Sequence, residues 1–446
     1  MRWRKPARIA LALLLGVAVA ATVRGTAGQA QPPLGLRISP ARMGAPGRVE
    51  AELTITGLQP EPPPTIEWTI TVGGQTIRRP PHPLIAPRIP ASIDLPAGRV
   101  RVGGDVSVAE FTPVPPIDEN LQIAVEVTAR QGPAAATAKQ IALVRLPTVI
   151  VPGYLNDLEG SADPAVISGL EQRGFSATGP APDLFWFSYR SRALSLRTAA
   201  AALAAYVRDV VLRESYAARI NIVAYSLGGL MARWNIAFES GWDHLVDRLI
   251  LTGTPNEGSV TSYLYAWYPA ATVARTPAAR ELLPTFPFWR PDDRTPWSVP
   301  PDGQNPTLAA LNTHPLPEAI RVYALYGSRE RTLSGIAGRL PHAVLSYGPG
   351  DGVVLQASAL GLPVNGGAGV PGLAGHFVAT IDLGPQRHLR LLGAAIPKIA
   401  DLLLDRRTAH RSEPVEHAVA PVGRGAAPAR ATPGDRGTAG VRLRLP

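Results

Sequence analysis

The sequence predicts two folded parts in series, a small all-β sandwich and then an α/β domain with a mostly parallel sheet flanked by helices. Short runs with period-two alternation, separated by Pro and Gly, continue up to Leu146. Strand-like and helix-like segments then alternate up to Leu404, which favours a parallel sheet covered on both faces. Within this second part, an apolar run ends in a serine flanked by small residues at 220–229.

The segment that precedes both parts has the pattern of an export signal. Four basic residues within the first eight positions precede an apolar run at 9–23, and small residues follow up to Ala30. We therefore predict that residues 1–30 are a secretory signal peptide and that the protein is extracytoplasmic. An uncleaved membrane anchor is the alternative, although the apolar run is shorter than the roughly 20 residues that a membrane helix needs.

The β-rich part, residues 33–146, predicts an immunoglobulin-like sandwich. Its clearest strand-like runs lie at 49–55, 66–72, 106–111, 121–127 and 140–145. Trp68 is typical of a buried sandwich-core residue, and contact with a ligand is the alternative. A carbohydrate- or surface-binding role for this part is a further hypothesis.

The α/β part is predicted at residues 147–404, and residues 405–446 form a predicted disordered tail. The tail is rich in Arg, Pro, Ala and Gly and has few core-forming residues. The predicted strands of the α/β part are 148–151, 184–187, 220–225, 248–251, 320–326, 343–346 and 376–383. The predicted helices are 198–212, 227–239 and 389–404.

Composition excludes several function classes. The chain has no cysteine, so a disulfide, a thiol nucleophile and a cysteine-ligated metal are all excluded. The net charge is +10, but the first 31 residues carry five positive charges and residues 405–446 carry eight Arg against four acids. The body of the chain is therefore left near +1, and its charge gives no support to nucleic-acid binding.

Residues 220–229 read as a strand, a sharp turn at Ser226 and a helix, which is the pattern of a nucleophile elbow. The strained turn needs small residues two positions before and after the serine, and Ala224 and Gly228 satisfy that need. Alanine replaces the more usual first glycine of G-x-S-x-G. A serine becomes a nucleophile only when a base takes its proton and a carboxylate orients that base.

The order Ser, Asp, His expected for such a site narrows the search for the other two groups. Asp351 follows an apolar run in a glycine-rich turn, where an α/β sheet places its sites. A simple turn role is the alternative. His388 follows the last predicted strand and is the favoured base, whereas His376 starts that strand and is the alternative. The predicted oxyanion donors are the amides of Leu227, which follows Ser226, and Tyr154, which follows the first strand.

The ordered motifs of residues 147–404 resemble the α/β-hydrolase superfamily. Within it, they are most similar to lipases, lecithin:cholesterol acyltransferases and GPI inositol-deacylases. The segments that carry the resemblance are Val-Ile-Val-Pro-Gly-Tyr (149–154), Phe-Ser-Tyr-Arg (187–190), Ala-Tyr-Ser-Leu-Gly-Gly (224–229), Gly-Thr-Pro-Asn-Glu-Gly-Ser (253–259), Leu-Leu-Pro (282–284) and Gly-Asp-Gly-Val-Val (350–354).

The resemblance implies a serine ester hydrolase that acts on lipid or other acyl esters through an acyl-enzyme, without a cofactor or metal, and the predicted signal peptide adds that it is secreted. It implies that residues of about 259–305 form a cap over an acyl pocket, and the alternative is a structural insertion whose aromatic side chains pack inward. Contact with a membrane or lipid surface is a further possibility. Two alternatives remain open: an acyltransferase that uses the same acyl-enzyme, and a non-catalytic extracellular binding protein. The sequence leaves the oligomeric state open.

Overall fold

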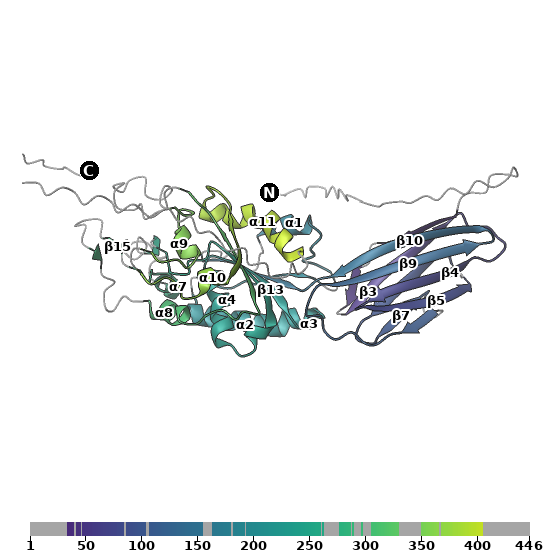
Figure 1. Ribbon diagram of the computed structural model, residues 1–446, viewed down its shortest axis with the longest axis horizontal. Coiled ribbons are helices and arrows are strands. Elements are labelled where there is room, and N and C mark those ends of the chain that lie inside the picture. The colour runs from purple at the N-terminus through teal and green to yellow at the C-terminus, as the bar shows by residue number, and fades with distance from the viewer. Residues whose placement is uncertain are drawn as a thin grey trace, which may run out of the picture. The chain divides into compact units, whose positions relative to one another are not determined.

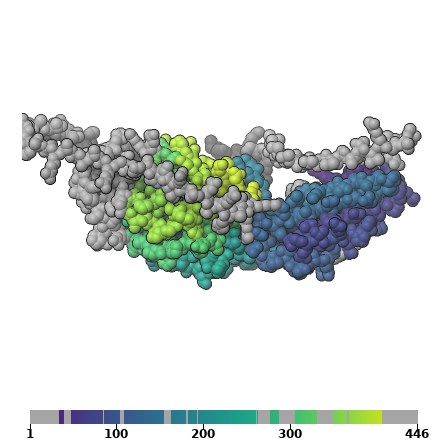
Figure 2. Space-filling view, viewed as in Figure 1, coloured from purple at the N-terminus to yellow at the C-terminus, as the bar shows by residue number. Residues whose placement is uncertain are grey.

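The computed structural model (Figures 1 and 2) describes residues 34–39, 42–45, 47–83, 86–103, 107–154, 163–179, 182–191, 193–259, 261–262, 276–286, 288–289, 296–297, 305–329, 349–364 and 367–404. The predicted signal peptide, the predicted tail, the run 343–346 and most of 259–305 lie outside these residues. No helix within the described part of the chain is long and apolar enough to cross a membrane.

The first part consists of two antiparallel sheets, as predicted (Figure 1). One has the order β1-β3-β6-β7-β8 with β2 paired to β3, and the other has the order β10-β9-β4-β5. The strands of the first sheet are β1 (Gly35–Ile38), β2 (Arg42–Ala45), β3 (Arg48–Thr56), β6 (Arg88–Asp94), β7 (Arg99–Val102) and β8 (Ser107–Glu110). The strands of the second are β4 (Thr65–Val72), β5 (Gln75–Pro83), β9 (Leu121–Gln131) and β10 (Ala134–Val144).

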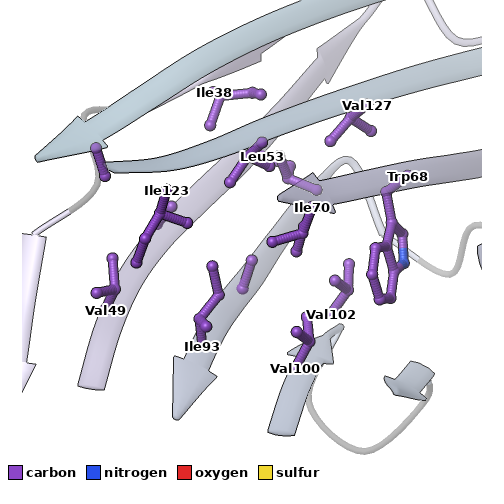
Figure 3. Close-up of a pocket in the computed structure, with 14 residues that line it drawn as sticks. Ile38, Val49, Leu53, Trp68, Ile70, Ile93, Val100, Val102, Ile123 and Val127 are labelled. Carbon is purple, nitrogen blue, oxygen red and sulfur yellow. The ribbon is translucent and has the colours of Figure 1, made fainter. Parts of the chain in front are cut away.

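The core of the sandwich follows from the two-residue period of its strands. In β4, every second side chain is buried, and these are Ile66, Trp68, Ile70 and Val72. Trp68 is 1% exposed and packs among apolar side chains from both sheets, which line a cavity of about 20 Å³ (Figure 3). A space of this size holds about one water molecule, so Trp68 is a core residue, as favoured from the sequence.

The second part contains a six-stranded sheet in the order β12-β11-β13-β14-β17-β18 among the described residues, and all of its strands run parallel. This order places β13, which ends at Tyr225, between β11 and β14 in the middle of the sheet (Figure 1). The strands are β11 (Thr148–Val151), β12 (Leu184–Trp186), β13 (Ile220–Tyr225), β14 (Val246–Thr252), β17 (Arg321–Tyr326) and β18 (Phe377–Asp382). A short antiparallel pair lies within 259–305, β15 (Phe288–Trp289) and β16 (Pro296–Trp297).

Helices cover both faces of the parallel sheet. Alternate residues of β13 separate the two cores, because Ile222 and Ala224 pack in the cluster that contains α2 and α4, whereas Val223 and Tyr225 pack in the cluster that contains α1 and α11. The helical segments are α1 (Pro164–Glu171), α2 (Leu196–Tyr206), the π-helix η1 (Val207–Val211), α3 (Leu212–Glu214), α4 (Leu227–Phe238), α5 (Trp242–Leu245), α7 (Pro277–Glu281), α8 (Pro306–Asn312), α9 (Gln356–Ala359), α10 (Leu373–His376) and α11 (His388–Leu404).

Candidate active site

Ser226 occupies the sharp turn between β13 and α4. Its φ is 53° and its ψ is −123°, and it is the only non-glycine residue with a positive φ in the described part of the chain. Such a conformation costs roughly 1–3 kcal/mol and persists only where the surroundings fix it. The Ser226 amide donates to the carbonyl of Thr252 at 2.9 Å, and the Ser226 carbonyl accepts from the Gly229 amide at 3.0 Å.

The residues around the turn must be small because other backbone lies against them. A Cβ atom at Gly228 would come within 2.3 Å of the Val151 carbonyl oxygen. A Cβ atom at Gly153 would come within 2.7 Å of the Ser226 Cβ. The loop after β11 and the start of α4 therefore meet at the serine with no room for a side chain on either glycine.

The structure brings Ser226, His388 and Asp351 together. The Ser226 Oγ lies 2.9 Å from the His388 Nε2, and the His388 Nδ1 lies 2.6 Å from the Asp351 Oδ2. The three residues are 7%, 6% and 2% exposed, respectively. Because a carboxylate can only accept, the Nδ1 carries the proton, and the Nε2 is left to accept the hydroxyl hydrogen of Ser226. The three groups are hydrogen-bonded in this order at the carboxyl edge of a parallel sheet. This arrangement, together with the strand order, identifies the fold of this part of the chain.

This part of the chain has the α/β-hydrolase fold. The strand order, the serine turn after β13 and the order Ser226, Asp351, His388 along the chain all agree with that fold. The part from β11 to α11 is called the hydrolase domain below.

The acid turn of the hydrolase domain fixes Asp351. Its Oδ1 accepts hydrogen bonds from the amides of Val353 at 2.9 Å and Val354 at 2.8 Å. Its backbone carbonyl accepts from the His388 amide at 2.8 Å. The Asp351 side chain therefore closes the turn with one oxygen and leaves the other for the imidazole. Asp351 therefore has both the turn role that was the alternative from the sequence and the contact with the proposed base, His388.

Residues 253–259, the Gly-Thr-Pro segment, hydrogen-bond to the residues that follow Asp351. The Ser259 hydroxyl donates to the Val353 carbonyl at 2.6 Å. The Ser358 hydroxyl accepts from the Glu257 amide at 3.1 Å and donates to the Gly258 carbonyl at 2.9 Å. These hydrogen bonds fix the position of the turn that carries Asp351 relative to residues 253–259.

Both ends of the 259–305 segment are tied to residues 281–283, which lie at the C-terminal end of α7 within the same segment. The Ser259 amide donates to the Leu282 carbonyl at 2.8 Å. The Asn305 side-chain amide donates to the carbonyls of Leu283 at 3.0 Å and Glu281 at 2.5 Å. The start and the end of this segment therefore lie close together, at residues 281–283.

The two predicted oxyanion donors lie on either side of the serine turn. Leu227 is the first residue of α4, where backbone amides have no partner within the helix. Tyr154 follows Gly153, where an added Cβ atom would come within 2.7 Å of the Ser226 Cβ. The Tyr154 hydroxyl lies 2.7 Å from the Thr276 Oγ1, and Thr276 caps the start of α7. The Tyr189 hydroxyl donates to the Pro152 carbonyl at 3.2 Å and holds the same loop.

The structure keeps the alternative histidine away from the serine. His376 is the last residue of α10, just before β18, and its Nε2 lies 3.2 Å from the Ile320 carbonyl oxygen. The carboxyl ends of the parallel strands lie at the opposite edge of the sheet, where His388 begins α11. His376 and His388 are therefore separated by the length of β18.

Sequence reasoning missed Tyr225, which contacts His388 with both its ring and its hydroxyl. Its place next to Ser226 and the alternation of β13 could have indicated a side chain on the α11 face. Nothing in the sequence indicates that its contact would be a residue 163 positions away.

Among the described residues, no group of three or more His, Asp or Glu side chains is arranged to hold a metal ion.

Glu257 is a buried carboxyl group outside the hydrogen-bonded chain of Ser226, His388 and Asp351. It is 1% exposed, and its Oε1 has no hydrogen-bond partner among the described residues. Burial raises the pKa of Glu257 from 4.5 to about 7.

Replacing Glu257 by glutamine is expected to stabilise the folded protein at pH 8 by about 2–3 kcal/mol. The unfolded chain ionises this glutamate near pH 4.5, whereas the folded chain keeps the proton up to about pH 7. The wild type therefore loses stability as the pH rises through this window, and the glutamine variant does not. Urea unfolding at pH 5 and pH 8 measures the difference.

The matched control for this prediction is Glu171→Gln on α1, because Glu171 is exposed. This control measures what the removal of an exposed carboxylate does to the unfolding free energy at each pH. A Glu257→Gln gain of the same size at pH 5 as at pH 8 would contradict a raised pKa at Glu257.

Comparison with known families finds one match within the hydrolase domain. Residues 194–247 match the family model described as "Putative serine esterase (DUF676)". The matched segment contains α2, β13, Ser226 and α4. No curated protein matches the chain.

Several solved structures resemble the chain. The mature lipase BlEst2 of Bacillus licheniformis is 18% identical, with 58% of this chain and 92% of that chain covered and a TM-score of 0.40. The lin2722 gene product of Listeria innocua is 13% identical, covering 60% and 96% with a TM-score of 0.36. The metagenomic carboxyl esterase MGS0156 is 15% identical, covering 58% and 76% with a TM-score of 0.34. The site geometry and the family match together indicate a serine ester hydrolase.

Proposed function

We propose that the protein is a secreted serine carboxylic ester hydrolase, lipase- or esterase-like, that acts on lipid or other acyl esters through an acyl-enzyme. The observation that carries the proposal is the continuous hydrogen-bonded chain from the Ser226 Oγ through His388 to Asp351. Together with the strained serine turn, this chain supports Ser226 as the nucleophile, His388 as the general base and Asp351 as the group that orients the base.

Acylation begins when the His388 Nε2 takes the hydroxyl proton of Ser226 as the Oγ attacks the ester carbonyl carbon. The carbonyl oxygen becomes an oxyanion, and the amides of Leu227 and Tyr154 are the proposed donors to it. Asp351 stabilises the imidazolium that forms. The tetrahedral intermediate then expels the alcohol, which receives the proton from His388, and the acyl group remains on the Ser226 Oγ.

Deacylation repeats these steps with water as the nucleophile. His388 takes a proton from water, the hydroxide adds to the acyl carbon, and the Ser226 Oγ leaves with the proton returned by His388. An alcohol in place of water would give acyl transfer from the same intermediate. Adding an acceptor alcohol to the assay and measuring the new ester therefore separates a transferase from a hydrolase.

The substrate class is tested with p-nitrophenyl esters from acetate to palmitate. The segment of about 259–305 is the proposed cap of the acyl pocket, and Phe286 within it is 0% exposed, which supports apolar packing there. A preference for long acyl chains would support a lipase, and a preference for acetate or butyrate an esterase. Binding to anionic and neutral lipid vesicles tests the proposed contact with a lipid surface.

The nucleophile is tested by labelling the wild type with a fluorophosphonate and mapping the modified peptide by mass spectrometry. We expect one label, on Ser226, because only an activated serine reacts at a useful rate. No label and no hydrolysis across the ester series would contradict the proposal and would favour a non-catalytic extracellular binding protein.

Export is tested on the protein made by cells that recognise a secretory signal. We expect the protein in the extracytoplasmic fraction, with a new N-terminus near Gln31. Full-length protein that starts at Met1 and stays with the membranes would favour the uncleaved anchor.

A further inference from the structure

Tyr225 is the last residue of β13 and lies directly before Ser226. Its ring centroid lies 5.0 Å from that of the His388 imidazole, with 32° between the two planes. Its hydroxyl donates to the backbone carbonyl of His388 at 2.7 Å. One tyrosine therefore contacts both the side chain and the main chain of the proposed general base.

The surroundings of Tyr225 hold it in place from the other side. A Cβ atom at Gly153 would come within 3.1 Å of the Tyr225 Cδ1, so the loop with the proposed oxyanion donor packs against the ring. The tyrosine is 9% exposed. Burial and the nearby Asp351 carboxylate both raise the pKa of Tyr225, and the hydroxyl therefore remains a donor at neutral pH.

Packing alone does not account for the hydroxyl. A phenylalanine would fill the same apolar volume among the side chains of the α11 face, and a buried hydroxyl needs a partner to offset its desolvation. The partner here is the carbonyl of the residue that begins α11 and carries the imidazole. The hydrogen bond therefore ties the end of the strand that precedes the serine to the residue that must face it.

We propose that Tyr225 is a positioning residue for His388, whose hydroxyl fixes the main chain of the histidine and whose ring supports the imidazolium. This inference rests on the proposed function. As the Ser226 Oγ forms its bond to the acyl carbon, its proton moves to the Nε2 and the imidazole becomes a cation. An aromatic face next to a cation stabilises it electrostatically, so the ring acts in the transition state and the hydroxyl acts in both states.

Two substitutions separate the two contributions. Tyr225→Phe keeps the ring and removes the hydrogen bond, and we expect kcat to fall about tenfold with KM unchanged and the acid limb of the kcat/KM profile in place. Tyr225→Leu also removes the ring, and we expect kcat to fall about a hundredfold. Asp351 and Tyr225 are the titratable groups that contact the imidazole among the described residues. Without the ring, the acid limb is expected to move to lower pH by about half a unit.

Tyr323→Phe in β17 is the matched control, because it removes a hydroxyl from a buried tyrosine of the same sheet. All rates are divided by the concentration of active sites titrated with the fluorophosphonate, so that a loss of folded protein does not count as a loss of kcat. Rates within twofold of the control for both Tyr225 variants, or an acid limb that stays in place in Tyr225→Leu, would overturn the inference. A wild type without hydrolysis or a titratable serine would overturn the proposed function as well, which distinguishes the two failures.

Discussion

Replacing Ser226 by alanine is expected to lower kcat/KM for a p-nitrophenyl ester by about 10⁵-fold or more. The Ser226 Oγ is the atom that would carry the acyl group. Among the described residues, no other hydroxyl forms a hydrogen bond with the His388 Nε2. Loss of the nucleophile removes the covalent route, and only binding and the oxyanion donors still act on the ester. Steady-state hydrolysis, measured with the folded state checked by circular dichroism, gives the effect.

The matched control is Ser168→Ala, because Ser168 is an exposed serine on α1. Its kcat/KM is expected to stay within twofold of the wild type. Alanine at 226 keeps the same backbone and the same buried neighbours, so its unfolding midpoint is expected to remain near that of the wild type. Equal hydrolysis by Ser226→Ala and the wild type would contradict the proposed mechanism.

The second large effect is expected at the histidines. His388→Ala should lower kcat/KM by about 10⁴-fold or more, because the proton of Ser226 then has no acceptor and Asp351 has no imidazole to orient. His376→Ala should stay within about threefold of the wild type, because its contact is the Ile320 carbonyl at the start of the neighbouring strand. The pair compares two histidines that the sequence places at opposite ends of one strand.

A pH profile adds a second measurement to this comparison. Hydrolysis by His376→Ala should keep the acid limb of the wild type, whereas the residual activity of His388→Ala should rise with hydroxide and show no such limb. Loss of activity in His376→Ala together with normal activity in His388→Ala would reverse the assignment of the base.

The serine turn could be predicted because its information is local. An apolar strand, small residues at 224 and 228 and a helix-forming segment stand within ten positions of Ser226. The choice between His388 and His376 also followed from a simple rule, because a parallel sheet puts residues after a strand at one edge and residues before it at the other. In agreement with this rule, the His388 Nε2 lies 2.9 Å from the Ser226 Oγ.

Sequence reasoning missed β1, β2, β5, β6 and β7 of the first part, and prolines explain two of these misses. β5 contains three prolines, which lower its strand pattern, but it lies at the edge of its sheet, where a missing amide costs least. β6 contains Pro90, which also lowers its strand pattern, but β6 lies inside its sheet and is paired with both β3 and β7. β10 begins at Ala134, six residues before the predicted start, because its alanine-rich first half is held by pairing with β9 rather than by its own strand propensity.

The support around the site could not be predicted, because it consists of contacts between distant residues. Tyr225 meets His388 across 163 positions, and Ser259 meets Val353 across 94. The amino acids involved are common in cores and turns, and their types carry no signal for a partner. Only the assembly of the parallel sheet and the packing of α11 and the loops against it bring them together.

The ends of the 259–305 segment meet at residues 281–283, and this has a consequence for divergence among such enzymes. Residues 281–283 lie inside the segment and divide it into two stretches, 260–280 and 284–304, whose ends are bonded at one place. A stretch with fixed ends can change in length or composition with little entropic cost to the rest of the domain. In the proposed cap, either stretch could therefore be exchanged to alter substrate preference, with Ser259, 281–283 and Asn305 kept as the junctions of a laboratory chimera.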